Sequence, residues 1–168
     1  MTARKTTRST TRGAGSAVSQ RIVVAGPGAI GCLFAGILAE AGYNVTLLDH
    51  KPARARILER TGINIRRGRT SRRIRVPATA RAADIGMADI LFLCVKSYDT
   101  AAAASRASQL IGPGTTVVSL QNGLDNAKAI LPFAAMSQVV CGVTGHGALS
   151  TGVGRVVHAG TGQPRLAP

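Results

Sequence analysis

The sequence is short of cysteine and of long apolar runs, and each shortage excludes a class of protein. Its three cysteines, Cys32, Cys94 and Cys141, lie far apart inside apolar stretches, so neither a disulfide framework nor a zinc site is expected. No stretch approaches the roughly 20 uninterrupted apolar residues that cross a bilayer, and the N-terminus lacks the apolar core of a secretory signal. These absences predict a soluble protein of the reducing cytoplasm, with no membrane partner and no metal.

Acidic residues are also scarce, with seven Asp and Glu against 21 Lys and Arg and a net charge of +14. The excess is local, because residues 1–21 carry +5, residues 51–81 carry +10 and the remainder carries −1. Seventeen of the basic residues are Arg, a bias that genomic base composition can produce as well as a polyanionic partner. Aromatic residues are not interleaved with the cations, and no nucleic-acid-binding motif occurs. The sequence therefore argues against a nucleic-acid partner.

The length and the apolar content predict one folded domain. The chain has 168 residues, of which 45% are hydrophobic, enough to bury a core. Residues 1–20 are Thr, Ser, Arg and Gly with almost nothing to bury, so we predict a disordered basic tail there. An organelle transit peptide has a similar composition, but this segment lacks the apolar stripe of an amphipathic helix. We therefore expect the domain to span residues 21–168.

Short apolar runs alternate with helical patterns through that domain. Such alternation predicts an α/β fold of Rossmann type, with a doubly wound, mainly parallel sheet, because parallel neighbours need a crossover. The expected strands are 22–25, 44–48, 90–95, 115–120 and 139–143, and the expected helices are 29–41, 52–60, 100–111 and 125–131. Two further patterns indicate antiparallel pairs: a hairpin of 62–65 with 73–76, rich in Arg and with one solvated face, and a pair of 154–159 with 163–166.

A glycine motif joins the first expected strand to the first expected helix. Gly26, Gly28 and Gly31 form G-x-G-x-x-G directly after the strand, and this context predicts dinucleotide binding. The first glycine allows the tight turn, the second lets a pyrophosphate approach the backbone, and the third lets the helix pack on the strand. Asp49 follows at the end of the second strand, where an acid binds the adenosine ribose. A glycine turn that serves chain geometry alone is the alternative.

Polar residues follow the other strands, at the sheet edge where α/β proteins bind ligands. They are Lys96, then Gln121 to Gly123, then Thr144 and His146. Each has a simpler explanation: a lysine in solvent, a turn that needs no ligand, and a histidine that is a local hydrogen-bond partner. We therefore do not include His146 among the candidate catalytic residues. The set contains no paired carboxylates and no His/Cys cluster at metal spacing, so hydrolase and metalloenzyme functions lose support.

Four segments resemble one known family. They are GPGAIGCLFAGILAEAGYNVTLLDH, ADILFLCVKSYDTAAA, VVSLQNGLDN and CGVTGHGALSTGVGRVVHAGTG, and together they are similar to the N-terminal domain of ketopantoate reductase (2-dehydropantoate 2-reductase). The resemblance covers residues 21 to about 167. It implies a Rossmann domain followed by an all-helical domain, and NADPH-dependent reduction of the 2-keto acid ketopantoate to pantoate in the biosynthesis of pantothenate and coenzyme A.

The resemblance also implies roles for particular residues. The loop of Gly26, Pro27, Gly28, Ala29, Ile30 and Gly31 would bind the pyrophosphate of the cofactor. Lys96 and Asn122 would be the catalytic residues of this half, lying near nicotinamide and substrate, and Ala148 would line the nicotinamide side. Asp49, His50, Lys51 and Arg54 would surround the adenosine ribose. There an acid favours NAD, whereas Lys51 and Arg54 could bind the 2′-phosphate of NADP, so NADP is expected and NAD is the alternative.

Two features separate the sequence from the family pattern. The helical domain, which carries the proton-donating lysine of the family, has no counterpart in these 168 residues, so the isolated chain is expected to be inactive or weakly active without a separate helical domain or subunit. His50 stands where the family has an arginine for the 2′-phosphate. Two alternatives therefore stay open: a non-catalytic dinucleotide-binding module whose basic hairpin docks a partner or nucleic acid, and another two-domain dehydrogenase, such as one acting on glycerol phosphate.

Overall fold

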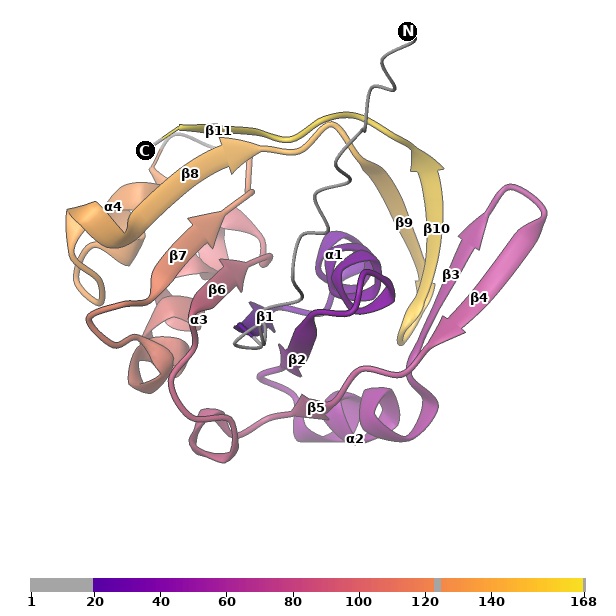
Figure 1. Ribbon diagram of the computed structural model, residues 1–168, viewed down its shortest axis with the longest axis horizontal. Helices are drawn as coiled ribbons and strands as arrows, with labels where there is room; N and C mark the ends of the chain where they lie inside the picture. Colours follow the sequence, from indigo (N-terminus) through magenta and orange to yellow (C-terminus); the bar gives the residue numbers. More distant parts are fainter. Residues whose placement is uncertain (1–19, 123–124, 168) are drawn as a thin grey trace, which may run out of the picture.

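Seven strands form the main sheet, in the order β11-β8-β7-β6-β1-β2-β5 (Figure 1). The structure is a computed structural model that describes residues 20–122 and 125–167; the predicted tail thus lies, except for its last residue, outside the described residues. All neighbouring strands are parallel except β8 and β11, which confirms the α/β, Rossmann-type sheet. The strands are β1 (Arg21–Ala25), β2 (Asn44–Leu48), β5 (Ala78–Thr79), β6 (Ile90–Leu93), β7 (Thr116–Ser119), β8 (Val139–Val143) and β11 (Arg165–Ala167).

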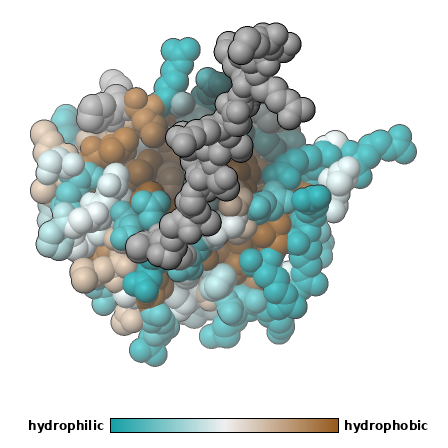
Figure 2. All heavy atoms as spheres, viewed as in Figure 1, coloured by the Kyte–Doolittle hydropathy of each residue, from teal (hydrophilic) through white to brown (hydrophobic). Residues whose placement is uncertain are grey.

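A second sheet of four strands has the order β4-β3-β10-β9. Its strands are β3 (Ile63–Arg67), β4 (Thr70–Ile74), β9 (Gly147–Gly152) and β10 (Arg155–Gly160). β3 and β4 form the predicted hairpin, and Figure 2 shows the hydrophilic side chains that project from this side of the molecule. β10 lies parallel to β3 and antiparallel to β9.

The predicted pairing of 154–159 with 163–166 is wrong. β10 pairs with β9 and β3, whereas β11 crosses to the main sheet and pairs with β8. The reason is burial: beside β3, Val156 of β10 is 3% exposed and joins Ile63 and Ile65 in one apolar cluster with the first helix. A local hairpin would leave that side chain without this cover.

Helix α1 (Ala29–Glu40) lies between the two sheets (Figure 1). Its buried side chains, including Cys32 and Leu33, pack against Ile22 and Val24 of the main sheet and against the second sheet. The helix begins very close to the end of β1, because a Cβ atom on Gly31 would lie 2.2 Å from the Gly26 carbonyl oxygen. The third glycine of the motif therefore has the packing role that the sequence predicts.

The other helices are short. They are α2 (Pro52–Thr61), α3 (Thr100–Ala107) and α4 (Asn126–Ile130), with 3-10 turns at Ala82–Asp84, Ser97–Asp99, Ser108–Leu110 and Met136–Gln138. The helix predicted for 100–111 is thus α-helical only to Ala107. Its alanines pack in a second apolar cluster with β6 and β7. Within the described residues, no helix is long and apolar enough to cross a membrane.

The close approach at Gly31 predicts a sharp difference in stability between two alanine substitutions in the glycine motif. Gly31→Ala places a methyl group against backbone that cannot move away cheaply, so we expect a loss of about 1–3 kcal/mol in the free energy of unfolding. Gly28→Ala is the matched control, because a Cβ atom there meets nothing within 4 Å. Urea unfolding followed by circular dichroism measures both, and equal midpoints would contradict the packing role.

Candidate functional site

The glycine loop connects β1 to α1 at the carboxyl edge of the main sheet. Gly26 has a φ of +94°, a conformation that favours glycine, and its N–H donates to the Leu48 carbonyl oxygen at 3.0 Å. Gly28 is the N-cap residue of α1 and has open space on the side where a Cβ atom would stand. An anion can therefore approach the loop and the positive end of the helix dipole together.

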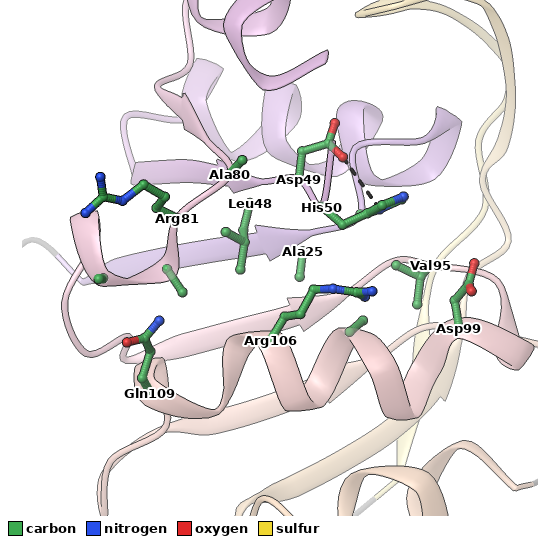
Figure 3. Close-up of a pocket in the computed structure, with 14 residues that line it drawn as sticks. Ala25, Leu48, Asp49, His50, Ala80, Arg81, Val95, Asp99, Arg106 and Gln109 are labelled. Carbon is green, nitrogen blue, oxygen red and sulfur yellow. Dashed lines mark ion pairs between the residues drawn. The ribbon is translucent and has the colours of Figure 1, made fainter. Parts of the chain in front are cut away.

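A cavity of about 360 Å³ lies beside this loop, near the point where the chain order reverses between β1 and β6 (Figure 3). It is lined by the end of β1, the end of β2, the 3-10 turn after β5, and α3. Most of the apolar residues that line it are alanines, and the polar ones include the basic side chains of His50, Arg81 and Arg106. The full lining is Ala25, Gly26, Leu48, Asp49, His50, Ala80, Arg81, Ala82, Ala83, Val95, Asp99, Ala103, Arg106 and Gln109. Crevices at such reversal points are where open α/β sheets bind ligands.

Asp49 lies at the end of β2, as predicted, but its carboxylate is already bonded. The residue is 1% exposed, and its Oδ1 accepts hydrogen bonds from the Lys51 N–H at 3.0 Å and from Arg54 Nη2 at 2.7 Å. Arg54 Nε also donates to Oδ2. The same hydrogen bonding raises the pKa of Arg54. Asp49 and Arg54, predicted as opponents at the ribose, therefore form an internal pair.

Lys96 and Asn122 both follow strands of the main sheet, at the same carboxyl edge, and both are exposed. They are absent from the lining of the cavity. Lys96 caps the 3-10 turn Ser97–Asp99, and the Asn122 carbonyl oxygen accepts a hydrogen bond from Asn126 Nδ2 at 3.3 Å. The structure therefore places the two candidate catalytic residues beyond the alanine-lined cavity.

A buried hydrogen-bond network supports the strand ends that carry Lys96 and Asn122. Gln121 Nε2 donates to the Val95 carbonyl oxygen and to Thr100 Oγ1, each at 2.8 Å. Thr100 Oγ1 in turn donates to Asn126 Oδ1 at 3.1 Å, and Ser119 Oγ donates to Gln121 Oε1 at 2.9 Å. The network joins β6, β7, α3 and α4. The sequence alone did not indicate roles for Thr100 and Asn126. The pattern that could have pointed to them was a polar residue at the start of each helix.

Two arginines that sequence reasoning also missed line the cavity. Arg81 forms an ion pair with Asp84 at 3.4 Å. Arg106 reaches from α3 into the cavity (Figure 3), and no ion pair to it is formed within the described residues. The available signal in the sequence was a cation two residues after the alanine run of α3. His50 lines the cavity as well, whereas Lys51 does not.

Ala148 and His146 lie where β8 of the main sheet leads into β9 of the second. Ala148 is the residue of β9 that stands opposite His158 of β10. His146 Nδ1 lies 3.0 Å from His158 Nε2. The His146 ring thus has a hydrogen-bond partner, but that partner comes from another strand and is not local in the chain.

The cysteines near the loop are chemically quiet. Burial raises the pKa of Cys32 and of Cys94 to about 12, so both remain protonated thiols at neutral pH. Among residues 20–122 and 125–167, no group of three or more His, Cys, Asp or Glu side chains could hold a metal ion.

A parallel sheet with a glycine loop and a cavity at its chain-order reversal defines a Rossmann-type α/β domain. The family model described as "Ketopantoate reductase PanE/ApbA" matches residues 22–168. The chain belongs to this family of oxidoreductases, as the sequence resemblance implied.

Individual relatives agree with this assignment. The chain is 39% identical over 147 residues to a 2-dehydropantoate 2-reductase of Halobacterium salinarum, covering 87% of this chain and 48% of the relative. It also matches a PanE/ApbA family ketopantoate reductase of Ralstonia eutropha, with a TM-score of 0.79, 30% identity, and coverage of 87% and 48%. A D-mandelate dehydrogenase in complex with NADH matches with a TM-score of 0.77, 25% identity, and coverage of 87% and 46%. The chain thus spans about half the length of the curated relatives it matches.

The Asp49–Arg54 pair predicts a stability effect that a neighbouring arginine does not share. Arg54→Ala leaves the buried Asp49 carboxylate with fewer donors, so we expect a loss of about 1–3 kcal/mol in the free energy of unfolding. Arg56→Ala is the control, because Arg56 is exposed on the same helix and should change stability by less than about 0.5 kcal/mol. Chemical denaturation at neutral pH compares them, and equal losses would show that the pair contributes nothing.

Proposed function

We propose that this chain is the cofactor-binding half of a 2-dehydropantoate 2-reductase, which reduces ketopantoate to pantoate with NADPH. The observation that carries the proposal is the open backbone at Gly28, at the N-terminus of α1 and beside the alanine-lined cavity. This cradle fits a pyrophosphate, and the cavity fits an adenosine. Membership of the ketopantoate reductase family supports the reaction and the 2-keto acid substrate.

In this proposal the described residues bind and orient rather than exchange protons. When bound, the reduced nicotinamide supplies the hydride for the keto carbon of the substrate. The glycine loop anchors the pyrophosphate, and Ala148 lines the nicotinamide side. Lys96 and Asn122, on strand ends supported by the Gln121 network, orient substrate and nicotinamide. The alkoxide that forms needs a proton, and we assign its donor to a helical domain or subunit outside this domain.

The preference for NADPH follows from the charges around the cavity. Arg54 bonds both carboxylate oxygens of Asp49, so the acid that would favour a free 2′-hydroxyl is compensated. His50 and Arg106 line the cavity, and Lys51 and Arg54 lie close to His50 in the chain. Permanent cations bind phosphate through charge-assisted hydrogen bonds, roughly twice as strong as neutral ones.

The binding role is tested by Gly28→Val. A branched side chain would occupy the place of the pyrophosphate while meeting no protein atom near its Cβ, so we expect cofactor affinity to fall at least about tenfold and the unfolding midpoint to stay close to that of the wild type. Fluorescence titration with NADPH measures the affinity. The 168-residue chain alone should bind NADPH without sustained ketopantoate-dependent oxidation, and co-expression with a helical partner segment should restore turnover. Equal titrations for both proteins, or robust turnover by the chain alone, would refute the proposal.

Cofactor choice is tested by removing cations. Replacing Lys51 and Arg106 together by Ala should move the ratio of NADPH to NADH affinity toward NADH by roughly tenfold, the equivalent of about 1.4 kcal/mol. Arg56→Ala, at an exposed arginine farther along α2 than the N-cap residue Lys51, should leave the ratio unchanged. The wild-type preference should weaken as salt rises. A wild-type chain that prefers NADH by tenfold or more would contradict the assignment of phosphate-binding roles.

A further inference from the structure

Two histidines from different sheets face each other at the carboxyl edge of β8. His146 follows β8 of the main sheet, and His158 belongs to β10 of the second sheet. His146 Nδ1 and His158 Nε2 are 3.0 Å apart, and the ring centroids are 5.1 Å apart. At this distance one nitrogen must donate its proton and the other must accept it. The contact therefore requires that one of the two facing nitrogens has no proton.

The pair is held from several sides. The His146 ring packs edge-on against Phe34 of α1, with centroids 5.7 Å apart, and the backbone N–H of His146 donates to Thr144 Oγ1 at 3.1 Å. In the second sheet His158 stands between Ala148 of β9 and Arg67 of β3. The segment from Thr144 to Ala148 is thus fixed at one end by its strand and at its centre by the histidine contact.

We propose that His146 and His158 are positioning residues, which hold the Thr144–Ala148 segment in place to receive the nicotinamide half of the cofactor. This inference rests on the proposed function, because it takes Ala148 as part of the nicotinamide wall. Neither ring needs to touch the reacting atoms. Their role is to tie the wall of the site to the second sheet, and through Phe34 to the helix that begins at the glycine loop.

The surrounding charges make this tie sensitive to acid. Loss of solvent around His158, the facing His146 and the positive charge of Arg67 lower the pKa of His158, while a backbone hydrogen bond to Gly160 opposes them. Arg67 also forms an ion pair with Glu40 at 3.0 Å. Neutral His158 is therefore the form that the fold favours, and the stability it contributes is present at neutral pH. That stability is lost as the pH falls below about 6.5, the ordinary histidine value, toward the lower value in the fold.

The test measures affinity for NADH and for NADPH between pH 5.5 and 8 in the 168-residue chain. In the wild type we expect both affinities to fall at least about threefold from pH 7.5 to pH 5.5, because protonation of His158 removes the acceptor that the contact needs. His158→Gln keeps an acceptor that does not titrate, so it should retain neutral-pH affinity and remove most of the acid-dependent loss. His158→Leu keeps volume but no acceptor, so its affinity should be low at every pH. A merely structural role would weaken both variants without changing the pH profile.

Two controls distinguish the role of the His146–His158 pair from an effect of His50 and from the proposed cofactor binding itself. His50→Gln tests the remaining histidine, which lines the adenosine cavity. Whatever this variant does to affinity, adding His158→Gln to it should still remove most of the acid-dependent loss. Nitrogen-edited NMR of the imidazole rings, without cofactor, should show the hydrogen bond between His146 and His158 at neutral pH and its loss when His158 is protonated. Identical pH profiles for wild type and His158→Gln would overturn the positioning role. Absence of binding of either cofactor at every pH would instead refute the proposed function, while the NMR titration would still confirm or refute the pair.

Discussion

The close contact between the start of α1 and the end of β1 is the constraint on which the rest of the structure depends. Because Gly31 has no side chain, the helix begins against the Gly26 carbonyl group. That position puts the helix N-terminus at the carboxyl edge of the sheet and sends the helix between the two sheets. The apolar cluster that α1 forms with both sheets, and the anion cradle at Gly28, follow from this one approach.

The main sheet could be predicted from the sequence because its signals are local. Five of its parallel strands, β1, β2, β6, β7 and β8, appear where the sequence has short apolar runs. The sixth, β5, has only two residues and no apolar run, and it was not predicted. The second sheet was predicted only as far as its hairpin. β9 is polar and glycine-rich, and β10 pairs with β3 across about 90 residues of chain, so no local pattern reveals either partner. Long-range pairing is decided by burial against α1, which the sequence does not display.

The residues of the candidate site likewise fall into those that the sequence predicted and those that it did not. The glycine loop and Asp49 were found because their spacing in the chain is diagnostic, and the structure brings both to the cavity. The bond between Asp49 and Arg54 was not foreseen, because two groups five residues apart were assigned to the ligand instead of to each other. The sequence did not indicate roles for Arg106, Thr100 and Asn126, for a different reason. A polar side chain on an otherwise alanine-rich or amphipathic helix has no distinctive pattern until the helix is placed.

The pairing of β3 with β10 has a consequence for the growing chain. Strand β3 is complete at Arg67, but its second neighbour begins only at Arg155, so during synthesis one edge of the hairpin waits unpaired while about 90 further residues are made. Exposed strand edges recruit other chains, and positive charge on an edge discourages this. Arg66, Arg69, Arg72 and Arg73 all lie exposed on the waiting hairpin. The positive charge of this hairpin therefore discourages its association with the strand edges of other chains while β3 waits for β10, and in the folded domain Arg72 forms an ion pair with Glu40.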